Sequence, residues 1–348
     1  MKKILSRPGL STAYKGVVCI VLMIGIIQAN FRLIAQEPQF SQFYAAPLYL
    51  APSFAGATDG SRLGLNYRNQ WPSIPGAFVT YAFSLDHYFH NFNSGVGLLV
   101  LRDQAGTGRL ANTSMNLMYS YNFQVNHNLT LRPGVAFSVA ERTLDFFRLT
   151  FGDQLDLGGQ HRPTTVNPVV PIERVRYFDA AASVVAHSNT IWAGLTVDNL
   201  MRPNRSMLDG QVNRIPMKFS VFAGYRYEYG GFLRGDADES ISLALLYRNQ
   251  GKFNQLDVGL YWSKHPISLG LLYRGIPIFN NYEHGLFNND AIVAIAGIRT
   301  RFLRLGYSYD MTISRLINTT GGSHEISLIY HFNQGPPNRT PRMLPCPD

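Results

Sequence analysis

The sequence is almost without cysteine, because only Cys19 and Cys346 occur among its 348 residues. Cys19 lies early in an apolar N-terminal run, and it follows Val17 and Val18 where a lipoprotein cleavage site has small residues. If that run is removed as a signal, a single cysteine is left and no internal disulfide can form. The sequence therefore disfavours a lipid anchor and excludes a disulfide framework in the mature chain.

Charge is also scarce. Only 15% of the residues are Asp, Glu, Lys or Arg, compared with about 25% in ordinary soluble domains. Hydrophobic residues make up 46% of the chain, which has 22 Phe, 19 Tyr and 31 Gly. Nevertheless, nothing after residue 35 forms an apolar stretch of roughly 20 residues, the length that a transmembrane helix needs. This combination is typical of a transmembrane β-barrel with an apolar outer face and a polar inner face.

The first 35 residues are predicted to be a signal peptide. Basic residues precede an apolar run over 16–27, which is too short to cross a bilayer as a helix, and Ala29 and Ala35 follow it. We expect cleavage near Ala35, with Ala29 as the other candidate and an uncleaved anchor as the alternative. Residues 1–35 contain five basic and no acidic residues, so their removal lowers the formal charge from +9 to +4. Nucleic-acid binding thereby loses its main support, and no nucleic-acid partner is expected.

Apolar and polar residues alternate through the rest of the chain. In one such segment Ile241, Leu243, Leu245 and Tyr247 share one face, and Ser242, Ala244, Leu246 and Arg248 share the other. A soluble β-sandwich also alternates, but it seldom gives runs of about nine to eleven residues with small or polar inward residues. We therefore predict an all-β fold, a transmembrane antiparallel β-barrel of about 14 strands. The segments lie at about 61–70, 76–86, 94–103, 110–123, 129–142, 177–187, 190–198, 215–228, 240–248, 254–263, 266–274, 290–299, 302–310 and 323–332.

The connections between these segments fall into two classes. The four longest all follow odd-numbered segments, and outer-membrane barrels have short periplasmic turns and long external loops. This parity predicts that both termini lie in the periplasm and that residues 143–176 form the largest external loop.

The same pattern divides the precursor into four parts: the signal peptide (1–35), an N-terminal segment (36–60), the barrel (61–332) and a periplasmic C-terminal tail (333–348). Residues 36–60 are rich in aromatic residues and proline and show no period, so they pack either inside the barrel mouth or against another chain. The inward-facing Arg68, Arg226, Arg248, Asn66 and Asn116 predict a polar lumen. Such a lumen suits an open pore and a plugged barrel equally.

Catalytic and metal-binding motifs are missing from the sequence. The nine histidines are dispersed, and His87 and His90 have no third ligand at a suitable spacing. Ser323 and His324 are adjacent as in some barrel hydrolases, but neighbouring strand residues point to opposite faces. We expect neither an enzyme nor a cofactor or metal.

A series of short words runs through the mature chain. They are Glu37-Pro38-Gln39-Phe40-Ser41-Gln42-Phe43, Ala51-Pro52-Ser53-Phe54-Ala55-Gly56, Tyr67-Arg68-Asn69-Gln70-Trp71, Tyr81-Ala82-Phe83-Ser84-Leu85-Asp86, Gly306-Tyr307-Ser308-Tyr309-Asp310, Thr312-Ile313-Ser314 and Gly321-Gly322-Ser323-His324-Glu325-Ile326-Ser327-Leu328. In these words and their order the chain resembles the PorP/SprF family of outer-membrane proteins associated with type IX secretion and gliding motility. Ala51 and Ser53 depart from the family's Asn-Pro-Ala-Tyr-Ala-Gly word, and the tail with Cys346 does not match it.

This resemblance implies a noncatalytic barrel of the outer membrane that binds and anchors secreted or surface proteins at the cell exterior, or links the secretion apparatus to the membrane. The implied partner bears a C-terminal sorting domain, and other type IX secretion components are further candidates. Outer-membrane lipid is also expected to contact the barrel. The residues expected to contact a partner lie in the predicted external loops and rim: Asn69, Gln70, Trp71, Phe146, Phe147, Phe151, Met201, Met207, Ile276, Ile278, Phe279, Tyr309 and Asp310. The alternative is a porin or small-solute transporter, and an outer-membrane hydrolase ranks third.

Overall fold

The computed structural model describes residues 37–149, 174–229, 239–276, 288–313 and 319–333. The predicted signal peptide and, apart from Asn333, the predicted tail lie outside these described residues. No helix in the described part is long and apolar enough to cross a membrane. The strands are β1 (Ser61–Gln70), β2 (Phe78–Phe89), β3 (Ser94–Ala105), β4 (Leu110–Tyr121), β5 (Phe123–Gln124), β6 (Thr130–Thr143), β7 (Arg174–His187), β8 (Ile191–Asp198), β9 (Lys218–Tyr229), β10 (Glu239–Gln250), β11 (Phe253–Lys264), β12 (Ile267–Ile276), β13 (Asn288–Arg299), β14 (Leu303–Thr312) and β15 (Ser323–Phe332).

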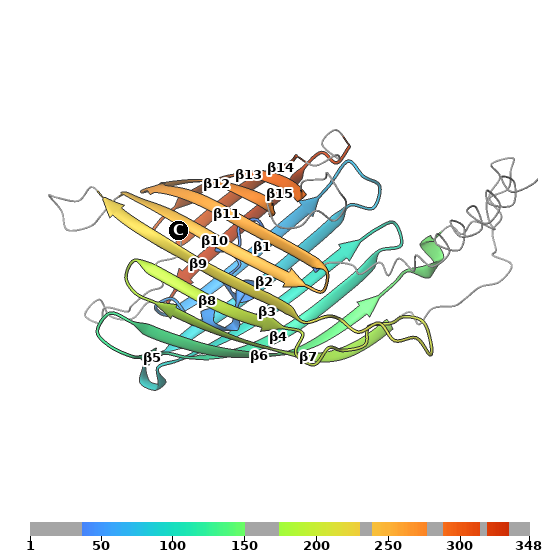
Figure 1. The fold of residues 1–348 in the computed structure, drawn as a ribbon, viewed down its shortest axis with the longest axis horizontal. Helices are drawn as coiled ribbons and strands as arrows, with labels where there is room; N and C mark the ends of the chain where they lie inside the picture. The colour runs from blue at the N-terminus through green and yellow to red at the C-terminus, as the bar shows by residue number, and fades with distance from the viewer. Residues whose placement is uncertain (1–36, 150–173, 230–238, 277–287, 314–318, 334–348) are drawn as a thin grey trace, which may run out of the picture. The chain divides into compact units, whose positions relative to one another are not determined.

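The strands close into one antiparallel barrel (Figure 1). β1 pairs with β2 on one side and with β15 on the other, in a register that runs from Ser61 opposite Phe332 to Gln70 opposite Ser323. The two-residue β5 extends β4 after a break, and both pair with β6. Counted this way the barrel has 14 strands, which confirms the prediction, and each strand ends within three residues of its predicted bounds.

The outer face of the wall is apolar. Residues that lie opposite each other on neighbouring strands share a face, so Tyr67, Tyr81 and Ile326 form one outward row. The most exposed members of this surface are large hydrophobic side chains, such as Phe137 and Phe178 at 68% and 67% exposure. An exposed apolar surface of this extent is unfavourable in water but matches the hydrocarbon layer of a bilayer.

The connections give the barrel two different ends. Four long connections, 144–173, 199–217, 277–287 and 313–322, all join strands at the end of β1 that carries Gln70, which we call the loop end. Ser61 and Phe332, the first and last residues of the wall, lie at the opposite end, which we call the terminal end. The distribution of long connections agrees with the parity expected from the sequence.

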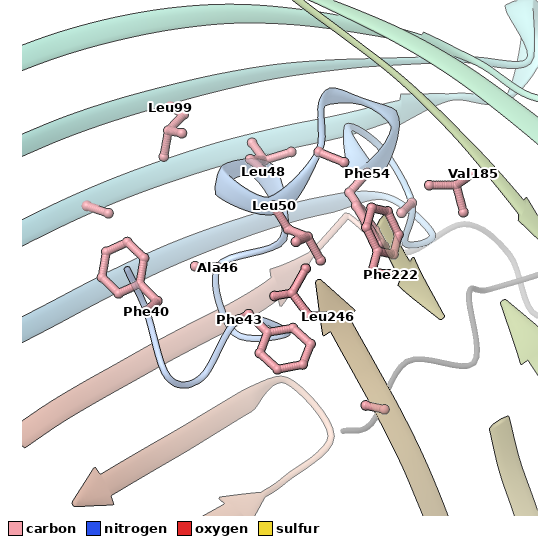
Figure 2. Packing of buried hydrophobic residues seen from close by; sticks show 14 of the residues in the cluster. Phe40, Phe43, Ala46, Leu48, Leu50, Phe54, Leu99, Val185, Phe222 and Leu246 are labelled. Carbon is pink, nitrogen blue, oxygen red and sulfur yellow. The ribbon is translucent and has the colours of Figure 1, made fainter. Parts of the chain in front are cut away.

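Residues 38–57, which we call the inner segment, pack inside the barrel (Figures 1 and 2). The segment contains the four-residue helix α2 (Pro47–Leu50) and the 3-10 turn η1 (Pro52–Phe54). Its large apolar side chains are buried against inward-facing residues of the wall, as Figure 2 shows for Phe54 and Phe222. The lumen is therefore occupied by the chain's own N-terminal region.

Proline and glycine explain how the inner segment fits. Pro47 and Pro52 begin the two short helices, where the donor that proline lacks has no intrahelical acceptor. The wall supplies space through glycine, because a Cβ at Gly95 would lie 2.0 Å from the carbonyl oxygen of Ala55 and one at Gly134 would lie 2.4 Å from the backbone nitrogen of Ser53. Only glycine allows these backbones to approach so closely.

Candidate functional site

A buried ion cluster lies inside the barrel near its loop end, centred on Arg68 of β1. The Arg68 guanidinium donates to Asp310 Oδ2 of β14 at 2.7 Å and to Glu325 Oε2 of β15 at 3.1 Å. Alternation along each strand explains why these three side chains point inward, since their neighbours Tyr67, Tyr309 and Ile326 face the other way. The cluster thus joins strands that lie on both sides of the barrel closure.

Arg274 of β12 extends the cluster around the wall. It donates to Asp310 Oδ2 at 3.2 Å and to Asp257 Oδ1 of β11 at 3.2 Å, and Arg248 of β10 donates to Asp257 Oδ2 at 2.6 Å. Three guanidinium groups thus meet three carboxylates, all with side chains at most 10% exposed. Buried charges need such partners, because an isolated charge in a low-dielectric interior costs several kcal/mol.

The inner segment completes this cluster through Ser41 and Gln42. The backbone N–H groups of Ser41 and Gln42 donate to the two carboxylate oxygens of Glu325 at 2.7 and 3.0 Å. The Ser41 hydroxyl donates to Asp310 at 2.6 Å and accepts from Arg68 at 2.7 Å and Arg274 at 3.1 Å. We call this arrangement the loop-end latch, because it ties the inner segment to charged side chains of four strands.

A second polar cluster holds residues 53–56 near the terminal end. Arg132 of β6 donates to the carbonyl oxygens of Ser53, Ala55 and Gly56 at 3.2, 2.9 and 3.0 Å. On the opposite flank Arg62 of β1 pairs with Asp86 of β2 at 2.9 Å, and the Gly56 N–H donates to Asp86 at 2.8 Å. Arg62 also donates to the carbonyl oxygen of Phe54 at 3.1 Å. This terminal-end latch binds the backbone of the inner segment, whereas the loop-end latch also binds the hydroxyl of Ser41.

Aromatic contacts fill the space between the two latches. The Tyr44 ring meets Trp192 of β8 and Tyr261 of β11 edge-on, each with ring centroids 5.9 Å apart. The Phe54 and Phe222 rings lie 5.6 Å apart (Figure 2). A cavity of about 80 Å³ remains between the inner segment and the wall, lined in part by Tyr44, Tyr261 and Gly306. That volume accommodates a few water molecules and does not form a wide channel.

Five of the predicted contact residues lie on or beside β1 and β14. Asn69, Gln70 and Trp71 are partly exposed at the loop end, where the Trp71 N–H donates to the carbonyl oxygen of Gly322 at 2.9 Å. Tyr309 is partly exposed and packs against His324. Asp310 lies near the loop end as predicted, but it is only 2% exposed and faces the lumen, so its side chain is not open to an external partner. Its carboxylate is occupied by Arg68, Arg274 and Ser41.

The other predicted contact residues belong to the long connections at the loop end. Met201 is 62% exposed, while Met207 and Phe146 are half-buried. Phe147 follows Phe146 in the 3-10 turn η3 (Phe146–Arg148), and Ile276 is the last residue of β12. Phe151, Ile278 and Phe279 lie outside the described residues. The structure thus places the described members of the set at one end of the barrel but does not join them into a single surface.

Sequence reasoning missed most of the latches. It predicted inward-facing Arg68 and Arg248 but not their carboxylate partners Asp257 and Glu325, nor the role of Ser41. The signal was present in the strand pattern, since alternation with Tyr309 puts Asp310 on the inner face. His324 and Ser323 do point to opposite faces, because Ser323 is buried and His324 contacts the Tyr307 hydroxyl on the outer side at 2.8 Å. Within the described part, no three His, Cys, Asp or Glu side chains could together hold a metal ion.

The fold and its interior define a class: a closed transmembrane β-barrel of the outer-membrane type, with its lumen occupied by its own N-terminal segment. The model of the family described as type IX secretion system membrane protein PorP/SprF matches residues 33–330. The chain belongs to this family, as its sequence words indicate, and it is located in the outer membrane.

Solved structures of other outer-membrane proteins are similar at low identity. CymD, a monoaromatic hydrocarbon channel, is 10% identical with a TM-score of 0.45, over 83% of this chain and 93% of that one. The P. putida toluene transporter TodX has the same identity and TM-score, over 82% of this chain and 93% of that one. Omp33 of Acinetobacter baumannii is 9% identical with a TM-score of 0.42, over 80% and 100%. A search of curated proteins gave no match.

Proposed function

We propose that this barrel binds a secreted or surface protein at its loop end and anchors it to the outer membrane as part of the type IX secretion or gliding apparatus. The proposed partner carries a C-terminal sorting domain, and other type IX secretion components meet the barrel at its terminal end. The protein acts without catalysis. Membership of the PorP/SprF family supports the type IX assignment of this role.

The filled lumen is the observation that carries the proposal. A solute transporter requires a continuous or gated path through the barrel. Here the inner segment is bonded to the wall near both ends, and its apolar residues, such as Phe40 and Phe54, are 1% exposed. A barrel closed in this way offers its surface, rather than its lumen, to other molecules.

The connection 199–217 supports a binding role at the loop end. It exposes Met201, Leu208 and Val212 at 62%, 48% and 72%. The same connection carries Arg202 and Arg214, both exposed. Exposed apolar side chains with arginine beside them are typical of protein interfaces, where a few residues supply most of the binding energy.

Affinity purification tests the proposal directly. The tagged barrel is isolated from outer membranes in mild detergent, and co-purifying chains are identified by mass spectrometry. We expect a secreted protein with a C-terminal sorting domain, and its recovery should fall by about tenfold in a Met201→Ser/Leu208→Ser/Val212→Ser variant. The matched control is Phe92→Ser/Val125→Ser, which changes exposed apolar residues at the terminal end. Equal recovery from both variants would contradict a binding site on this connection.

Conductance in planar bilayers distinguishes the alternative function. We expect no single-channel current from the wild-type barrel, and a variant without residues 38–57 should conduct if it still inserts. Steady current from the wild type, together with the absence of any co-purifying chain, would instead support a porin or small-solute transporter.

A further inference from the structure

The outer wall carries three arginines beside the lipid-facing surface, Arg102 of β3 and Arg174 and Arg176 of β7. The strands β4 and β6 lie between β3 and β7 in the wall (Figure 1). One row across these strands is apolar and consists of Val100, Met115, Val139 and Phe178. The next row towards the loop end consists of Arg102, Thr113, Glu141 and Arg176, and the row after it of Gln104, Ala111, Thr143 and Arg174. The outer surface of the wall therefore changes from apolar side chains to rows that contain arginine over a distance of two residues along each strand.

These arginines point outward, because they are in register with outward residues. Arg102 lies opposite Tyr81, which is 52% exposed, and Tyr81 lies opposite Tyr67. Exposed tyrosines near the ends of barrel strands mark the level of the lipid headgroups. The arginine rows thus begin beside this aromatic girdle, at the boundary between hydrocarbon and headgroups.

A depression of about 430 Å³ lies within this basic region. Its lining includes Arg102, Arg109 and Arg174, together with Gln104, Thr143 and Asp145. Glu141 pairs with Arg176 at 2.7 Å and with Arg174 at 3.5 Å, and Asp145 pairs with Arg148 at 2.9 Å. No described residue places a carboxylate within ion-pair distance of Arg102 or Arg109. Among the described residues, the ion pairs in and beside the depression join three other arginines, Arg148, Arg174 and Arg176, to two carboxylates, Glu141 and Asp145.

We propose that this depression, which we call the basic wall site, binds the phosphorylated headgroup of a lipid in the leaflet at the loop end. A guanidinium donates two parallel hydrogen bonds to a phosphate, which makes arginine well suited to this ligand. The acyl chains of the lipid lie along the apolar row below, against Met115, Val139 and Phe178. Charge and position both favour a lipid, since the site is continuous with the membrane surface of the barrel. The site is distinct from the proposed partner surface on connection 199–217.

Native mass spectrometry of the full-length barrel, delipidated in detergent and titrated with lipid A, tests this site. The wild type should bind lipid A about 25-fold more tightly than the same lipid after enzymatic removal of its phosphates, because Arg102 and Arg109 should each contribute about a factor of five at an anionic lipid surface. An Arg102→Gln/Arg109→Gln variant should lose this preference. The matched control is Lys252→Gln/Arg301→Gln, which removes two exposed basic residues from turns outside this site and outside connection 199–217.

Any of three results would overturn the proposal. One is a wild-type barrel that binds both forms of the lipid equally, a comparison that requires no variant to fold. A second is an Arg102→Gln/Arg109→Gln barrel that retains the wild-type preference for phosphorylated lipid A. A third is the same variant with unchanged lipid binding but without a protein that co-purifies with the wild type, which would make the site a protein interface. Heat-dependent migration on gels confirms that each variant is folded before binding is measured.

Discussion

The two latches hold the same inner segment by different means. At the loop end, the wall presents charged side chains from β1, β12, β14 and β15, and the segment binds them through the Ser41 hydroxyl and two backbone N–H groups. The Gln42 side chain adds hydrogen bonds to Ser308 and Ser327. At the terminal end, Arg132 donates hydrogen bonds to the backbone carbonyl oxygens of Ser53, Ala55 and Gly56. These bonds do not involve the side chains of the three residues. The first latch depends on the identity of two residues in the segment, Ser41 and Gln42, and the second depends mainly on the path of its backbone.

This difference has an energetic consequence. Charges at the loop end are mutually dependent, because Asp310 is shared by Arg68 and Arg274 and is completed by Ser41. At the terminal end, loss of Arg132 leaves neutral carbonyl groups, whose desolvation costs less than that of an unpaired charge. Loss of Arg68 at the loop end should therefore destabilise the barrel more than loss of Arg132 at the terminal end.

The largest effect is expected for Arg68→Met. The substitution leaves Asp310 and Glu325 with one fewer buried cation, and removal of one partner from a buried ion cluster typically costs about 3–5 kcal/mol. Urea unfolding in phospholipid vesicles measures the free energy of unfolding, with tryptophan fluorescence, to which the fully buried Trp192 contributes, as the signal. Adding Glu325→Gln to Arg68→Met should recover part of the loss. A double variant no more stable than the single one would show that charge imbalance is not the cause.

Arg132→Gln comes second. Three backbone carbonyls lose a charged donor, and we expect a loss of about 2–3 kcal/mol on the scale of buried hydrogen bonds to charged groups. The same urea titration measures it, with Arg301→Gln, a change of an exposed arginine in the turn after β13, as the control. If Arg132→Gln costs more than Arg68→Met, the proposed ranking of the two latches is reversed.

Replacing a glycine of the wall tests the backbone contact between β6 and the inner segment at the terminal end. In Gly134→Ala the new methyl group meets the backbone of Ser53, so the inner segment must shift, at a cost of about 1–3 kcal/mol. Protease cleavage within residues 38–57 should become faster. The control is Gly297→Ala, whose nearest neighbour is the Ser268 hydroxyl. Equal protection of the segment in both variants would argue that it does not pack closely on β6.

The sequence predicted the wall much better than the inner segment, for a physical reason. Lipid outside and polar groups inside impose a two-residue period on every strand, so even the bounds of β1 and β15 are read from local residues. The inner segment has no period, because its conformation is set by contacts with residues up to 285 positions away, as between Gln42 and Ser327. Asp310 illustrates the difference: its strand was predicted well, but its ion partners lie on strands that only the closed barrel brings together.

The smallest effect is expected for Ser41→Ala, which sharpens the comparison between the latches. Removing the hydroxyl deletes one donated and two accepted hydrogen bonds, but Arg68, Arg274 and Asp310 still neutralise one another, so we expect a loss of only about 1–2 kcal/mol. Combined with Arg132→Gln in a double-mutant cycle, the two losses should add to within about 0.5 kcal/mol if each latch holds its part of the segment independently. A combined loss well below the sum would mean that release at one end already frees the other, so that residues 38–57 leave the wall as a single unit.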